Sequence, residues 1–475
     1  MEKVKEKSSF FRKFVGDKRF YLMVLSIAVP IMVQNGITNF VSLLDNIMIG
    51  RIGTEQMSGA AIVNQLIFVY NLCIFGGVSG AGIFTAQYFG QKDHEGVRQT
   101  LRYKLWMAVI LTAITIILFL TAGGSLISIY LKGDGTAQEI RDTLIYGKQY
   151  LWIMLLGLPP FMMVQVYAST LRECGETVLP MKAGIVAVLI NLIFNYLLIY
   201  GKFGFPEMGV RGAAIGTLCA RAAETVMVLV YAIFRNKVVR IRLKDMVKID
   251  KVLLKDFAVY SMPVVLNELM WGLGTSANTA VIGHLGSAAV AANSVAQVAR
   301  QLATVVTFGI SHATAIYLGK TIGEGKMELA KAYGKRFVWL SLILGILGGV
   351  LILISAPIAN ANLALTGPAK NYLSFMFFVM SYFTVAQAFN TTMVVGVFRA
   401  GGDTKFGLIM DVSTMWGFSI LLGAVAAFIL HASVPVVYVI LMSDELIKVS
   451  ITLKRYLTYK WLRDVTREQK ELEEM

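Results

Sequence analysis

The stretch Tyr21–Gly50, YLMVLSIAVPIMVQNGITNFVSLLDNIMIG, has the length of a membrane-spanning helix and contains one acidic residue. A helix crosses the hydrocarbon core of a bilayer with about 20 apolar residues, so this longer run predicts a span that is tilted or bent at Pro30. Its polar side chains recur at helical spacing and share one face: Gln34, Thr38, Ser42 and Asp45. An aspartate near the bilayer centre costs roughly 2.5 to 3.5 kcal/mol, so Asp45 is the leading candidate for binding a proton, an ion or a ligand.

The overall composition is that of an integral membrane protein. Of 475 residues, 56% are hydrophobic and 15% are charged, and the mean hydropathy is +0.66. The formal net charge of +15 does not indicate nucleic-acid binding, because Lys and Arg gather in short segments between apolar runs. The three cysteines form no CxxC motif, so they support neither a disulfide framework nor a zinc site.

Twelve apolar runs of spanning length predict an all-α integral membrane protein. They lie near residues 21–50, 57–89, 105–131, 149–171, 178–201, 211–234, 254–283, 288–318, 337–360, 372–398, 405–430 and 434–453. A basic linker divides them into two sets of six. We therefore expect an N-terminal segment (1–20), an N-lobe (21–234), a linker (235–253), a C-lobe (254–453) and a C-terminal tail (454–475).

Positive charge alternates from loop to loop. The N-terminal segment, the second loop (with Lys92, Arg98, Arg102 and Lys104), the mid-chain linker and the tail are basic, whereas residues 284–287 and 431–433 contain no Lys or Arg. By the positive-inside rule, both termini and the linker are expected to be cytoplasmic, in a multi-pass protein of the plasma membrane. The tail has two open interpretations, a segment on the inner membrane surface or a solvated helix end.

The two halves of the sequence resemble each other. Pro30 and Gly50 recur as Pro263 and Gly283 at one constant offset, and at that offset Asn278 stands where the first half has Asp45. The segment 172–177 likewise matches 399–404. Two pseudo-symmetric six-helix bundles are therefore expected, and an arrangement of this kind suits alternating access by rocking of one half against the other.

Three motifs, taken together with this plan, make the chain similar to the multidrug and toxic compound extrusion (MATE) family. They are DNIMIGR at 45–51, GVRGAA at 209–214 and RAGGDTK at 399–405. The resemblance implies a secondary active exporter of cationic or amphipathic small molecules, in which protons or sodium ions flow inward in exchange. It implies no cofactor besides the coupling ion, and we expect a monomer.

Candidate residues for binding the coupling cation occur in both halves. The resemblance assigns this role to Asp45, and Asn191 and Asn195 share a helix face at i, i+4 spacing. Related proteins often have an aspartate at the second of these positions. An amide there can still coordinate sodium or hydrogen-bond a protonated acid, or it can serve only in helix packing. In the second half, Glu268 and Asp411 are candidates for coupling or for structural hydrogen bonds, so a sodium site is expected near Asp45 or Glu268.

Further polar and aromatic residues are expected either to line a substrate cavity or to pack between helices: Gln34, Thr38, Gln165, Asn267, Trp271, Asn293 and Gln297. In two groups of charged residues each acid has a basic residue within one helical turn, which favours structural ion pairs in which the charges cancel. The groups are Arg221 with Glu224, and Asp444 and Glu445 with Lys448.

Two other functions fit the sequence less well than export. A flippase for lipid-linked precursors has a similar architecture, but it would require a cationic cavity, and the acid-rich spans argue against one. A membrane-embedded enzyme lacks support, because the sequence has no HExxH, GxSxG or GxxxxGK[ST] motif.

Overall fold

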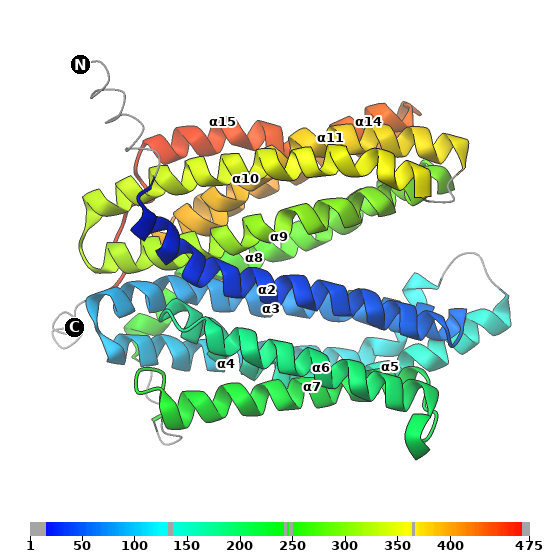
Figure 1. Cartoon of the computed structure of the whole chain (residues 1–475), viewed down its shortest axis with the longest axis horizontal. Helices are drawn as coiled ribbons and strands as arrows, with labels where there is room; N and C mark the ends of the chain where they lie inside the picture. The colour runs from blue at the N-terminus through cyan, green and yellow to red at the C-terminus, as the bar shows by residue number, and fades with distance from the viewer. Residues whose placement is uncertain (1–15, 132–135, 242–244, 247–249, 363–365, 468–475) are drawn as a thin grey trace. The chain divides into compact units, whose positions relative to one another are not determined.

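A computed structural model describes residues 16–131, 136–241, 245–246, 250–362 and 366–467, and within these ranges the chain is helical and contains no strand (Figure 1). In chain order the helices are α2 (Lys18–Gly50), α3 (Thr54–Gln91), α4 (His94–Tyr130), α5 (Ala137–Glu173), α6 (Val178–Tyr200), α7 (Val210–Val230), α8 (Lys251–His284), α9 (Ser287–Gly323), α10 (Met327–Asn362), α11 (Gly367–Thr391), α12 (Thr404–Thr414), α13 (Leu421–Ala424), α14 (Val434–Leu441) and α15 (Asp444–Leu457). Short π-helical segments continue α7, α11, α12 and α13.

Ten of these helical stretches are long and apolar enough to cross a bilayer, counted over the described residues. The two further predicted spans correspond to α8, which contains Pro263, and to the pair α14 and α15, which is interrupted at Met442–Ser443. The predicted all-α membrane fold with twelve helical spans is therefore confirmed.

The chain divides into two compact units, and three helices contribute to both: α2, α3 and α8, the last of which divides after Ala258. The C-terminal unit comprises residues 16–32, 86–93 and 259–467, and the N-terminal unit comprises residues 33–85 and 94–258, in each case without the gaps given above. The boundary within α2 falls after Met32, two residues beyond Pro30, and the helix continues through this proline. The boundary within α3 falls after Thr85.

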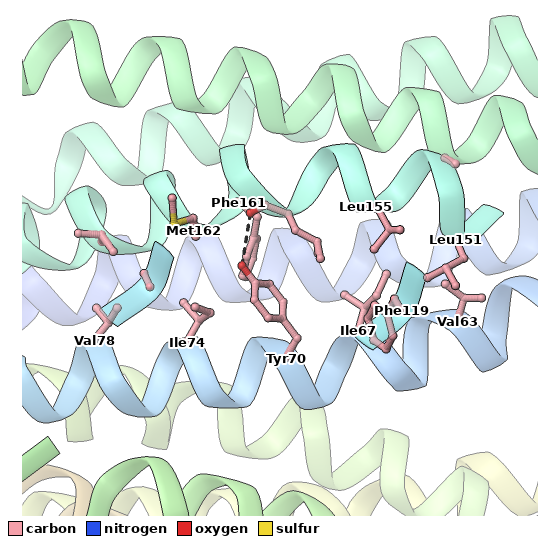
Figure 2. Close-up of a cluster of buried hydrophobic side chains, with 14 of the residues drawn as sticks. Val63, Ile67, Tyr70, Ile74, Val78, Phe119, Leu151, Leu155, Phe161 and Met162 are labelled. Carbon is pink, nitrogen blue, oxygen red and sulfur yellow. Dashed lines mark hydrogen bonds between the residues drawn. The ribbon is translucent and has the colours of Figure 1, made fainter. Parts of the chain in front are cut away.

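The core of the N-terminal unit is built on one apolar stripe of α3 (Figure 2). The side chains of this stripe recur every three or four residues, as an α-helix requires for one face: Val63, Ile67, Tyr70, Ile74 and Val78. They pack against Leu151, Leu155, Phe161 and Met162 of α5 and against Phe119 of α4. Inside this core the Tyr70 hydroxyl forms a hydrogen bond with Thr112 Oγ1, at 2.8 Å.

A buried ion pair joins α4 to α5 in the same unit. Lys104 is completely buried, and its ammonium donates to Glu173 Oε2 at 2.5 Å and to Ser169 and Thr170 hydroxyls at 3.3 Å. The prediction that Lys104 belongs to a basic loop is therefore wrong. Helix α4 begins ten residues earlier, at His94, and an ammonium inside the bundle needs an acidic partner.

Helices α9, α10 and α11 lie side by side in the C-terminal unit (Figure 1). The end of α9 closely approaches the end of α3 at Gly323 and Gln87. A Cβ atom at Gly323 would lie 2.0 Å from the carbonyl oxygen of Gln87, so this approach requires glycine.

The C-terminal segment after α15 is also packed into this unit. Trp461 is fully buried and stacks on Tyr456, with ring centroids 5.8 Å apart. The buried side chain of Gln87 donates to the carbonyl oxygens of Ala400 and Arg463, at 2.8 and 3.1 Å, and accepts from the Val465 amide at 2.8 Å. Residues 459–467 are therefore not a solvated helix end, whereas a position of the tail at the inner membrane surface stays a prediction; residues 468–475 lie outside the described chain, as do residues 1–15 of the N-terminal segment.

Replacing Gln87 with leucine is expected to lower the free energy of unfolding by about 1–3 kcal/mol, because buried backbone groups of the tail lose their partners. Thermal unfolding of the purified protein in detergent measures the change. Gln91→Leu is the matched control, since Gln91 lies one turn further along and its bonds to Asp464 and Thr466 are exposed. Equal unfolding temperatures for both variants and the wild type would contradict the assigned role of Gln87.

Candidate functional site

Three predicted coupling residues meet in the N-terminal unit. Asn195 Nδ2 on α6 donates to Asp45 Oδ1 on α2 at 2.7 Å and to Asn191 Oδ1 at 3.3 Å. Asn191 Nδ2 in turn donates to Thr217 Oγ1 on α7 at 3.2 Å. We call these four residues the Asp45 cluster.

Helix spacing and one glycine position the Asp45 cluster. Asn191 and Asn195 are one turn apart on α6, so both face the same neighbours, and both are buried. A Cβ atom at Gly216 of α7 would lie 2.2 Å from Asn195 Oδ1. The missing side chain of Gly216 therefore makes the room that the Asn195 amide occupies. Thr217, which was not among the predicted site residues, follows this glycine directly.

The chemistry of the Asp45 cluster is that of a hard oxygen site. A carboxylate, amide carbonyls and a hydroxyl are oxygen ligands, which suit a proton or an alkali cation better than a soft metal. Asp45 is the one carboxylate among the four residues, so its ionisation decides the charge of the cluster. Among the described residues, no group of three or more His, Cys, Asp and Glu side chains could hold a metal ion.

The other candidates of the N-terminal unit lie on α2 and α5. Gln34 is half-buried against α6, where a Cβ atom at Gly184 would lie 3.0 Å from Gln34 Nε2. Thr38 is exposed, and its hydroxyl donates to the Gln34 carbonyl oxygen at 2.9 Å. Gln165 is half-buried on α5.

A second polar cluster lies in the C-terminal unit around a nearly fully buried lysine. Lys448 Nζ on α15 lies 3.0 Å from Asp411 Oδ1 of α12, 3.0 Å from Asp444 Oδ2 and 3.2 Å from Glu445 Oε1. Asn267 Nδ2 on α8 donates to Asp411 Oδ2 at 3.0 Å. We call these five residues the Lys448 cluster.

The predicted neutralisation of charged groups is only partly observed. Arg221 Nη1 does pair with Glu224 Oε2, at 3.3 Å, as the spacing predicted. Asp444, Glu445 and Lys448, however, do not pair only with one another. Asp411, on a different helix, contacts the same ammonium group. Helical spacing reports only partners on one helix, so this third carboxylate could not be predicted from it.

The remaining candidates of the C-terminal unit have partners on other elements or nearby. Arg399 Nη2 pairs with Glu268 Oε1 at 2.5 Å, so Glu268 is part of an ion pair. Arg300 donates to Gln297 Oε1 at 2.8 Å and to Gln387 Oε1 at 3.4 Å. Asn293 is buried on α9, and Trp271 is half-buried on α8, one turn beyond Asn267.

Comparison with known proteins relates most of the chain to one family. The sequence model of the family MatE matches residues 30–197 and 263–425. Among curated relatives, a probable multidrug resistance protein NorM of Thermotoga maritima is 25% identical over 443 residues, covering 92% of both chains. The probable multidrug resistance protein YoeA of Bacillus subtilis is 23% identical over 82% of this chain and 83% of its own.

Solved structures share the fold at low sequence identity. One is described as an outward-facing conformation of a multidrug resistance MATE family transporter of the MOP superfamily. It is 18% identical, covers 98% of each chain and has a TM-score of 0.81. A MOP superfamily transporter from Pyrococcus furiosus, also 18% identical, covers 94% of this chain and 97% of its own with the same TM-score.

Proposed function

Because the chain belongs to the MatE family, we propose that it is a secondary active exporter of cationic or amphipathic small molecules, driven by inward flow of protons or sodium ions. The chain is a multi-pass membrane protein, and its relatives are named as resistance proteins and transporters, not as enzymes. The observation that carries the proposal is the Asp45 cluster, in which a carboxylate on a predicted membrane span is held by the Asn195 amide at 2.7 Å.

The proposed coupling step follows from the chemistry of Asp45. The ionised carboxylate accepts the Asn195 hydrogen bond, and a proton or a sodium ion competes with that bond for the same oxygens. Binding of the cation therefore changes the hydrogen bond that joins α2 to α6. Such a change links the cation to the arrangement of two helices, as alternating access requires.

The energy available to this step is sufficient for export. One charge moving through 100 mV yields about 2.3 kcal/mol, and each pH unit adds about 1.4 kcal/mol per proton. Since about 1.4 kcal/mol corresponds to a tenfold ratio, one coupled proton can concentrate a neutral solute roughly a hundredfold or more. For a monovalent cationic solute the exchange moves no net charge, so the pH gradient alone drives export, about tenfold per pH unit.

The proposal extends to topology and substrate contacts. We place the chain in the plasma membrane with both termini in the cytoplasm, because successive loops alternate between basic and non-basic composition. We also propose that it acts as a monomer. The predicted lobes and linker are part of this proposal. Trp271 offers an aromatic face for a cation, and the proposed polar contacts are Gln34, Thr38, Gln165, Asn267, Asn293 and Gln297.

Efflux of a fluorescent cationic dye from proteoliposomes tests the proposed function. We expect efflux to accelerate when either a proton gradient or a sodium gradient is directed into the vesicles and to slow when an ionophore collapses that gradient. The gradient that acts identifies the coupling ion. If neither gradient changes the efflux rate relative to vesicles without protein, the proposed exchange is wrong.

A further inference from the structure

We propose that residues 461–467, which we call the strap, hold the end of α3 in the C-terminal unit, and that release of the strap is part of the movement between transport states. The inference rests on the proposed function, because it concerns the conformational change that alternating access requires. Residues 54–85 of α3 belong to the N-terminal unit, and residues 86–91 belong to the C-terminal unit. A movement of one unit against the other must therefore bend α3 near this boundary or release residues 86–91 from their contacts.

The first argument is that the strap binds α3 along its last two turns. Gln87 and Gln91 are one turn apart and therefore share a face of the helix. Their side chains form hydrogen bonds with four successive residues of the strap. The partners of Gln87 are the Arg463 carbonyl oxygen and the Val465 amide, at 3.1 and 2.8 Å, and those of Gln91 are Asp464 Oδ2 and Thr466 Oγ1, at 3.0 and 2.6 Å.

The second argument is that the strap is fixed to the C-terminal unit where it begins. The Trp461 ring is fully buried, and its Nε1 donates to the Tyr456 carbonyl oxygen at 3.2 Å. The same ring packs on α10, where a Cβ atom at Gly334 would lie 3.3 Å from it. Arg455 Nε and Nη2 on α15 donate to the buried Asp403 carboxylate, at 2.7 and 2.8 Å. A segment with one end fixed in this way can restrain the helix that its other end contacts.

The third argument is that the RAGGDTK motif leaves room for the strap. A Cβ atom at Gly401 would overlap the Trp461 carbonyl oxygen, and the three atoms nearest to it are all backbone atoms of the strap. The first half of the repeat has Cys174 at this position. The next position is glycine in both halves, and Gly175 and Gly402 have φ values of 88° and 76°. The turn therefore requires the second glycine of the motif, whereas the strap requires the first.

The strap is also built to open. It contains no helix or strand, and Arg463 and Asp464 are exposed. The hydrogen bonds of Gln91 are exposed as well, so water can replace them at little cost. Segments with few buried apolar contacts and exposed hydrogen bonds open at a lower free energy than the core of the same protein. The strap can therefore detach from α3 while Trp461 stays in place.

The distance between spin labels at Lys92 and Lys326 tests this proposal in full-length protein in lipid nanodiscs. Both positions are exposed, and they directly follow the contacting ends of α3 and α9. Their separation therefore reports whether the end of α3 stays packed. The three native cysteines are replaced by alanine in every protein compared, so that only the two introduced cysteines are labelled.

Gly401→Ala is the main variant, because its added methyl group displaces the strap and leaves every side chain of the strap and of α3 unchanged. We expect the ratio of separated to packed ends to rise about tenfold, since loss of one or two ordinary hydrogen bonds has an effect of this size. Gly417→Ala is the matched control, because a Cβ atom there meets nothing within 4 Å, and it should match the wild type.

Two truncations make the same test without a substitution in the motif. Deletion of residues 463–475 removes the four hydrogen bonds to α3 and should raise the ratio as Gly401→Ala does. Deletion of residues 468–475 retains all four and should leave the ratio at the wild-type value. The first truncation decides the question if Gly401→Ala does not fold.

An unchanged distance distribution in folded Gly401→Ala and in the 463–475 deletion would overturn the strap. A lower unfolding temperature with unchanged distances would have the same meaning, because it would assign the tail to stability alone. The distances require neither dye nor gradient, so they are independent of the proposed function. Wild-type protein without gradient-driven efflux would contradict the exporter and leave the distance result unaffected.

Discussion

The Asp45→Asn variant is expected to lose gradient-driven dye efflux, with its rate falling to that of vesicles without protein. An asparagine at this position has nearly the shape of aspartate, but it neither takes up a proton nor attracts a cation by charge. Its amide oxygen can still accept the bond from Asn195, which now measures 2.7 Å. The variant should therefore fold normally and fail only in coupling. Efflux from proteoliposomes under the effective gradient measures the loss.

A matched control is available in the same unit. Glu224→Gln also converts a buried carboxylate into an amide, but Glu224 is paired with Arg221 on α7 and lies outside the Asp45 cluster. We expect Glu224→Gln to retain gradient-driven efflux. Efflux by Asp45→Asn at the wild-type rate, in protein that unfolds at the wild-type temperature, would remove Asp45 from the mechanism and direct attention to the C-terminal unit.

Part of the Asp45 cluster could be predicted from the sequence. The period of α6 places Asn191 and Asn195 on one face, and the repeat and the family resemblance single out Asp45. The structure adds the contact between them, which depends on the packing of α2 against α6 and on the space that Gly216 leaves. Residue spacing along one helix contains no information about which neighbouring helix it meets. Thr217 was missed for that reason.

The charged clusters were the least predictable part. Lys104 and Glu173 are far apart in the sequence, and Asp411 and Lys448 lie on different helices, so no local pattern connects them. The basic character of the tail likewise suggested a segment on the membrane surface or a solvated helix end, and it gave no indication that Trp461 would be fully buried. In these cases, burial of a few side chains outweighed the average polarity of the segment.

The Lys104→Met variant is expected to lower the free energy of unfolding by about 3–5 kcal/mol, because Glu173 would remain as a buried charge without its ammonium partner. Met fills nearly the same volume as Lys, so the loss reports the charge and not a cavity. The expected cost is high because Lys104 is completely buried, and its Nζ contacts Ser169 and Thr170 as well as Glu173. Unfolding in detergent mixtures of increasing sodium dodecyl sulfate measures this change.

The double variant Lys104→Met/Glu173→Gln separates the charge from other effects of the substitution. It removes both charges, and such replacements of buried pairs are often neutral or stabilising, so we expect most of the lost stability to return. Lys182→Met, at an exposed position of α6, should change stability by less than about 0.5 kcal/mol. If the double variant were as unstable as Lys104→Met, the uncompensated carboxylate could not be the cause. The instability would then come from the hydrogen bonds that Lys104 makes with Ser169 and Thr170.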